Sequence, residues 1–154
     1  MEQKKQKAEE AIRRYADMIY RLALSNVKSR HDAEDIFQDV CVALLSSSAP
    51  LDDDEHLRHW LIRATINKCK NFHKSVSRHR TEPLESAENI CSEEHQSLYE
   101  ELSSLPSKYR TVLYLYYYEG YSVKEVAKLL SLSENTVSSQ LRRARKKLRL
   151  LLEE

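Results

Sequence analysis

The chain has 154 residues, 32% of them charged, and a formal net charge of only +1, so its length allows one ordinary domain or two very small ones and its total charge indicates no partner. One Gly and three Pro leave too few turns to bound alternating strands, which makes an all-α fold the expectation. No apolar run approaches the ~20 residues of a transmembrane helix and no secretory segment begins the chain, so we expect no membrane insertion and a cytoplasmic protein.

The first two predicted helices each carry one apolar stripe. In the first, the stripe follows the 3.6-residue helical period through residues 12, 15, 16, 19, 20 and 23. The second is expected to have Asp32 as its N-cap, and its apolar positions recur from Ala33 to Leu44. Its opposite face is polar and carries Glu34, Asp35, Gln38 and Asp39. Acids in a first turn stabilise the helix dipole, which explains Glu34 and Asp35 but not Asp39, because it lies beyond that turn.

The third predicted helix runs from about His56 to Ser75, behind a loop in which residues 52–55 are all acids that can cap a helix. Its apolar stripe is wide: it includes Leu57, Trp60, Leu61, Ala64 and Phe72, with Ile62, Ile66 and Cys69 beside them. A second stripe is polar, has spacings that project from one face, and consists of Arg63, Asn67, Lys70, Asn71 and Lys74. Amide groups suit base edges while cations neutralise phosphates, so this stripe suits DNA, with a solvated helix face as the alternative.

An acidic segment follows this cationic helix. Residues 56–80 contain seven Lys and Arg and no acid, whereas residues 82–101 contain seven Glu and no Lys or Arg. Helical periodicity fades over 76–97, which predicts a flexible linker between an N-terminal domain at 8–75 and a C-terminal domain at 98–154. A tether keeps its charges near the helix it leaves. One hypothesis is therefore that Glu82, Glu85, Glu88, Glu93 and Glu94 cover Arg63, Lys70 and Lys74 in the free protein; a solvated spacer is the alternative.

The C-terminal domain begins with a Tyr-rich segment whose apolar spacing favours a helix over a strand. The expected core positions are Tyr109, Val112, Leu113, Tyr116 and Tyr117. Gly120 is the expected stop of this helix.

A helix-turn-helix is predicted next. Ser122 and Glu125 form a capping box that opens a short helix with Val126, Ala127 and Leu130 as its apolar positions. A turn through Ser131 and Leu132 leads to Ser133, the expected N-cap of a second helix that enters the DNA major groove. Residues 133–149 hold six basic residues against one Glu, and the expected exposed face carries Ser138, Ser139, Arg142, Arg143 and Lys146. Two separate basic blocks suit contact with a polyanion in two places; the alternative for this helix is a coiled-coil or solvated surface.

The remaining candidate chemistry is sparse. Cys41, Cys69 and Cys91 are an odd number at wide spacings, which favours reduced thiols over a disulfide framework. Cys69 and His73 lie four residues apart, but two ligands do not make a zinc site. The sequence has no Gly-rich phosphate loop and no nucleophile in a recognisable setting. We therefore expect that the protein is not an enzyme and binds no metal and no cofactor.

Three motifs, in order, resemble those of extracytoplasmic-function sigma factors of bacterial RNA polymerase. They are DAEDIFQD at 32–39, WLIRATIN at 60–67, and Leu105-Pro106 ahead of a helix-turn-helix that ends NTVSSQLRRAR at 135–145. The resemblance covers 12–75 and 102–150. It implies an all-α protein with a region-two helical bundle, a linker and a region-four helix-turn-helix domain, and it leads us to expect no additional regulatory segment.

The resemblance also implies partners and site residues. Core RNA polymerase would bind Asp35, Gln38 and Asp39, and the minus-ten element of promoter DNA would meet Asn67 and Asn71, with Arg63, Lys70 and Lys74 on the same stripe. The loop from Ala49 to Glu55 would capture a flipped base, with Leu51 in place of the common aromatic residue. The minus-thirty-five element would meet Ser138, Ser139, Arg142 and Arg143, with Lys146 nearer a phosphate. An anti-sigma factor is a further implied partner. The alternative, a helix-turn-helix transcriptional regulator that does not bind polymerase, leaves the acidic face of the second helix unexplained.

Overall fold

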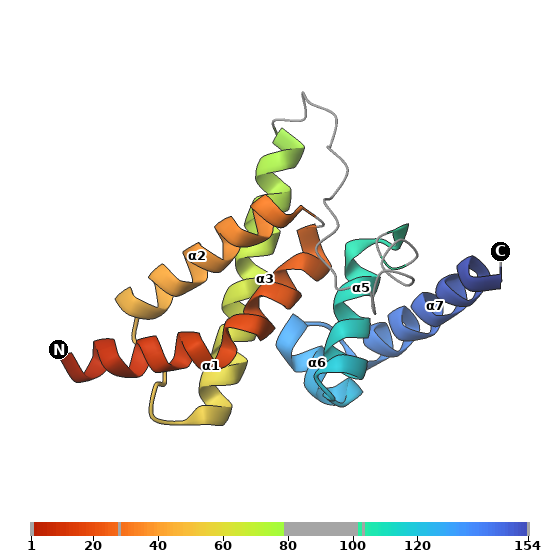
Figure 1. Cartoon of the computed structure of the whole chain (residues 1–154). Coiled ribbons are helices and arrows are strands. Elements are labelled where there is room, and N and C mark those ends of the chain that lie inside the picture. The colour runs from red at the N-terminus through yellow and green to blue at the C-terminus, as the bar shows by residue number, and fades with distance from the viewer. Residues whose placement is uncertain (1, 28, 79–101, 103, 154) are drawn as a thin grey trace. The chain divides into compact units, whose positions relative to one another are not determined.

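The computed structural model describes residues 2–27, 29–78, 102 and 104–153, and within these ranges it contains helices and no strand (Figure 1). The all-α prediction is confirmed. The helices fall into two compact units, one formed by α1, α2 and α3 and the other by α5, η1, α6 and α7. Residues 79–97 of the predicted linker, its five Glu and Cys91 lie outside the described residues, so the domain boundaries and the linker hypothesis stay predictions.

The first unit is a three-helix bundle in which every helix packs against the other two. α1 spans Glu2–Val27, α2 spans Arg30–Ser46 and α3 spans Asp54–Arg78. The predicted stripe of α1 is only partly correct, because residues 12, 16 and 20 are half-buried. The predicted Tyr15, Ile19 and Ala23 are buried, and the rest of the buried stripe follows the same helical spacing. The full set of buried residues is Ala8, Ala11, Tyr15, Met18, Ile19, Leu22, Ala23 and Val27.

The start of α2 differs from the prediction. Its N-cap is Ser29, which has extended backbone angles (φ −85°, ψ 130°) and whose Oγ accepts a hydrogen bond from the Asp32 N–H at 3.3 Å. Asp32 was therefore wrongly predicted as the cap: it lies in the first turn, where its charge suits the helix dipole. Ser and Asp both cap helices well, and only the backbone geometry shows which of these two residues is the cap. The predicted core positions Ala33, Ile36, Val40 and Leu44 are buried.

α3 begins two residues earlier than predicted because Asp53 caps it. The Oδ1 atom of Asp53 accepts a hydrogen bond from the His56 N–H at 3.2 Å. The predicted apolar stripe is partly correct, because Trp60, Ala64 and Phe72 are only half-buried. The core of α3 lies to one side of them and consists of Leu57, Leu61, Ile62, Thr65, Ile66 and Cys69. Thr65 is tolerated there because its hydroxyl donates to the Leu61 carbonyl at 2.7 Å.

The Tyr-rich segment of the second unit is helical, as predicted, but its helix widens. α5 (Ser107–Leu113) continues into a π-helical turn, η1 (Tyr114–Tyr118), closed by a hydrogen bond from the Glu119 N–H to the Tyr114 carbonyl at 3.0 Å. The extra residue in a π-turn shifts the helical register of the residues after it. Within this turn Leu115 is buried, and the predicted core residues Tyr116 and Tyr117 are half-buried and exposed, respectively. The chain then turns at Gly120 (φ +79°), the predicted stop.

The helix-turn-helix prediction is confirmed in its local geometry. α6 (Val123–Leu130) opens with the capping box, in which Ser122 and Glu125 exchange two hydrogen bonds of 3.1 Å. Ser131 makes the turn in the left-handed conformation (φ 58°), and Ser133 caps α7 (Glu134–Glu153) by accepting from the Thr136 N–H at 3.1 Å. The two helices pack together. Their buried residues are Val126, Ala127, Leu129, Val137, Leu141 and Ala144, so Leu129 takes the core position predicted for Leu130.

Replacing Ser122 with alanine should loosen α6. The substitution leaves the Glu125 N–H without its partner in the capping box, and losing such a cap costs about 1 kcal/mol. Hydrogen exchange of the Val126 and Ala127 amides should report this as roughly fivefold faster opening, while Ser122→Thr, which keeps the acceptor, should exchange nearly as the parent does. Equal exchange in all three proteins would contradict the role of the cap.

Candidate nucleic-acid and protein interfaces

The polar face of α2 is exposed, as its sequence pattern predicts. Asp35, Gln38 and Asp39 all face solvent, opposite the buried side of the helix. Because α2 begins at Arg30, Asp35 lies in the second turn. Stabilisation of the helix dipole by acids in the first turn therefore explains neither Asp35 nor Asp39. Within the described ranges Asp39 makes no ion pair, and Asp35 is 3.5 Å from the imidazole of His31. This face is therefore free to bind a basic partner surface.

Two apolar residues continue the same face. Val42, one turn beyond Gln38 and Asp39, is 63% exposed. Leu45 follows one turn later and is 46% exposed. A partner that binds the carboxylates could also cover these two side chains, and buried apolar contacts of this kind add affinity at an interface.

The polar stripe of α3 faces solvent along its whole length. Its five members, all exposed, are Arg63, Asn67, Lys70, Asn71 and Lys74. None of its three cations forms an ion pair with another residue that the structure describes. The stripe is thus a row of uncompensated positive charge interleaved with amides. Such a row can bind phosphates and read bases of a nucleic acid strand.

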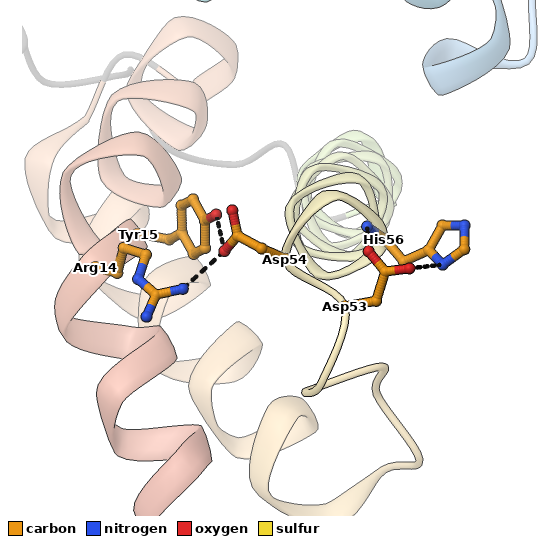
Figure 2. Close-up of polar contacts among 5 residues, drawn as sticks. All are labelled: Arg14, Tyr15, Asp53, Asp54 and His56. Atoms are coloured by element: carbon orange, nitrogen blue, oxygen red, sulfur yellow. Dashed lines mark hydrogen bonds and ion pairs between the residues drawn. The ribbon is translucent and has the colours of Figure 1, made fainter.

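The loop between α2 and α3 is held against α1 at its α3 end (Figure 2). Arg14 Nη1 and the Tyr15 hydroxyl both donate to Asp54 Oδ1, at 2.7 and 2.5 Å. The hydrogen bonds from Tyr15 and Arg14 lower the pKa of Asp54. Burial is the main cause that raises the pKa of Tyr15, and its hydrogen bond with Asp54 raises it further. Figure 2 also shows Asp53 beside His56, with 2.9 Å between Oδ2 and Nδ1. Asp54 therefore ties the start of α3 to α1, and Asp53 caps it locally.

The same loop forms one wall of a hollow of about 470 Å³. Figure 1 shows the loop crossing behind the first half of α1 before α3 begins. The residues lining the hollow are Gln3, Lys4 and Lys7 from α1 and Ala49, Pro50, Leu51, Asp52 and Asp53 from the loop. Sequence reasoning identified the loop but missed the α1 residues. No local pattern relates Lys7 to Asp52, which lies 45 positions further along the chain.

The predicted DNA-reading face of α7 lies on its solvent side. Ser138, Arg142, Arg143 and Lys146 are exposed, and Ser139 is half-buried. On the flank of this face Arg145 donates to the Tyr117 hydroxyl at 2.7 Å, a contact that fixes its guanidinium and that sequence reasoning missed. Tyr117 lies in the π-turn and is 56% exposed.

The described residues contain no group of three or more His, Cys, Asp or Glu that could hold a metal ion. Burial raises the pKa of the Cys69 thiol to about 12, so this side chain stays protonated at neutral pH and is a poor metal ligand. Among the same residues, none of the helices is both long and apolar enough to cross a membrane.

Comparison with known families matches both units. A model described as sigma-70 region 2 matches residues 11–79. A model described as sigma-70 region 4 matches residues 95–148. The first span contains the polar face of α2, the loop and the stripe of α3, and the second contains the helix-turn-helix.

Relatives that align over most of the chain agree with these matches. RNA polymerase sigma factor SigV of Bacillus subtilis is 31% identical over 138 residues, which are 86% of this chain and 83% of the relative. ECF RNA polymerase sigma factor SigM of the same organism is 30% identical over 156 residues, which are 93% of this chain and 93% of the relative. Among solved structures, sigma factor RpoE in complex with anti-sigma factor NepR from Bartonella quintana has a similar fold, with a TM-score of 0.77 and 19% identity over 94% of this chain and 96% of that one.

Proposed function

The chain belongs to the sigma-70 family, in its extracytoplasmic-function group, and we propose that it binds core RNA polymerase and directs it to promoter DNA in transcription initiation. The observation that carries the proposal is the presence of both family regions on one chain, each with its candidate surface exposed. Such a protein acts where polymerase and chromosome are, so the proposed location is the cytoplasm. The proposed role is binding and positioning, with no chemical step of its own.

Each surface has a proposed partner. The acidic face of α2, with Asp35, Gln38 and Asp39, binds core polymerase. The α3 stripe of Arg63, Asn67, Lys70, Asn71 and Lys74 binds the melted minus-ten strand, because amides and cations alternate along one exposed face. Ser138, Ser139, Arg142 and Arg143 of α7 read the minus-thirty-five element from the major groove, and Lys146 contacts its backbone.

An anti-sigma factor is a further proposed partner. The RpoE structure of similar fold was solved with its anti-sigma factor NepR. A factor that redirects polymerase needs to be withheld until required, and a protein that covers α2 or α3 would do so by competing with polymerase or DNA.

The proposal is tested by association of the purified full chain with bacterial core polymerase. A sigma factor forms a complex with the core enzyme that survives gel filtration and starts transcription at specific sites. A helix-turn-helix regulator without polymerase binding would elute separately, and that result would overturn the proposal. The polar face of α2 and the α3 stripe would then need another explanation.

Asn67→Ala should weaken use of the minus-ten element and leave the minus-thirty-five element unaffected. A side-chain amide that bonds a base edge contributes about 1 to 3 kcal/mol of discrimination, and Asn67 lies in the middle of the exposed stripe. Permanganate reactivity of the melted promoter strand, measured with holoenzyme at several salt concentrations, should fall about tenfold. Footprints over the upstream element serve as the internal control, and a variant that melts promoters as well as the parent would remove Asn67 from this role.

A further inference from the structure

Arg145 is held by a contact that orients its guanidinium and leaves its charge uncompensated. It lies on α7 one turn after Arg142, and its Nη1 donates to the Tyr117 hydroxyl at 2.7 Å. A phenol is a neutral acceptor, so this bond does not neutralise the cation. Among the residues that the structure describes, Arg145 forms no ion pair with an acid. A guanidinium has five N–H donors, so Arg145 can keep Tyr117 and still donate to an anion.

The tyrosine that makes this contact is itself supported. Tyr117 belongs to η1, and its ring meets the ring of Tyr116 edge-on, with 4.9 Å between the centroids and 80° between the planes. Tyr116 is half-buried, whereas Tyr117 is exposed. π-Helical turns are rare and occur frequently at functional sites. The ring of Tyr117 is therefore placed so that its hydroxyl can hold Arg145 in one position.

The place of Arg145 on α7 suits a phosphate better than a base. The buried residues Val137, Leu141 and Ala144 define the inner side of the helix. With 3.6 residues per turn, Arg142 lies well away from that side, whereas Arg145 lies closer to it, at the edge of the exposed face. A helix in the major groove turns its outer face to the base edges, and the phosphates that border the groove lie to its flanks.

We propose that Tyr117 is a positioning residue for DNA binding, whose hydroxyl holds Arg145 toward a phosphate that borders the minus-thirty-five element. The inference rests on the proposed function, which places α7 in the major groove. Phosphate contacts fix the register of a protein on the duplex and carry no sequence information. Because the guanidinium is already oriented, less side-chain freedom is lost when DNA binds.

The test compares variants of the full chain in complex with core polymerase. The probe is a labelled duplex whose upstream element has been selected from a randomised pool by the parent complex, and binding is measured by fluorescence anisotropy at increasing salt. Arg145→Ala should bind about tenfold more weakly at low salt, with a salt slope smaller by about 1, because one phosphate contact is lost. Tyr117→Phe keeps the cation and removes only the hydroxyl. It should bind about threefold more weakly, with an unchanged salt slope.

A double-mutant cycle separates positioning from a general effect on the fold. In the Arg145→Ala background, Tyr117→Phe should cause no further loss, because the guanidinium that the hydroxyl holds is absent. The matched control is Tyr118→Phe, which removes the hydroxyl of the neighbouring tyrosine, equally exposed at 56%. This control should bind as the parent does. Additive losses in the double variant, or an equal loss in Tyr118→Phe, would overturn the proposal.

Sequence selection tells a phosphate contact from a base contact. Arg145→Ala should select the same upstream sequences as the parent, and a change in the selected sequences would mean that Arg145 reads a base and that the proposal is wrong. A parent chain that binds neither core polymerase nor any duplex would contradict the proposed function itself. A parent that binds both, with Arg145→Ala binding equally, would contradict the present inference alone.

Discussion

Asp35→Ala combined with Asp39→Ala is expected to reduce the affinity of the chain for core polymerase by about a hundredfold or more. Close charge pairs at protein interfaces contribute about 1.5 to 7 kcal/mol, and about 3 kcal/mol corresponds to two orders of magnitude in the dissociation constant. Both carboxylates are exposed on one face of α2, and the dipole of that helix, which begins at Arg30, explains neither. Their removal should leave the helical circular dichroism unchanged, because no core residue is altered.

The matched control is Glu9→Ala with Glu10→Ala, which removes two exposed carboxylates from α1 of the same unit. It changes the net charge by the same amount, so loss of long-range attraction alone would affect both double variants equally. Affinity is measured by competition with a labelled parent chain for core polymerase. An Asp35 and Asp39 variant that competes as well as the parent would move the polymerase contact away from this face of α2.

The sequence predicts contacts between residues a few positions apart better than contacts between residues far apart in the chain. The capping box at Ser122 and Glu125 and four of the six predicted apolar positions of α2 involve residues a few positions apart, and the structure confirms them. The cap of α2 was wrongly predicted because Ser29 and Asp32 are both competent, and the choice between them depends on backbone angles that no residue type fixes. Local patterns determine which residues form helices better than where each helix begins.

The contacts that sequence reasoning missed join residues far apart in the chain. Lys7 contacts Asp52 across 45 positions, and Arg145 contacts Tyr117 across 28. The second contact also depends on the π-turn, which rotates Tyr117 out of the predicted core. Helical periodicity assumes a constant 3.6 residues per turn, so a single widened turn defeats it without any signal in the sequence.

Arg142 and Arg143 carry the second large expected effect, on recognition of the minus-thirty-five element. Both are exposed on α7, opposite the buried residues Val137, Leu141 and Ala144. A guanidinium that bonds two acceptors of a guanine contributes about 1 to 3 kcal/mol of discrimination. Replacing either arginine with alanine should therefore weaken binding about 5-fold to 150-fold and relax the preference at one base of the upstream element.

Lys146→Ala is the contrasting variant, because an exposed lysine that contacts the DNA backbone carries no sequence information. It should weaken binding to all sequences alike and reduce the salt slope by about 1. The measurement is selection of bound duplexes from a randomised upstream element by holoenzyme, at two salt concentrations, for the parent and each variant. The arginine variants should change which sequences are selected, whereas the Lys146 variant should change only how much DNA is bound. If both arginine variants select the parent's sequences with uniformly lower affinity, Arg142 and Arg143 contact phosphates, and the bases must be read by other residues on the exposed face of α7, such as Ser138.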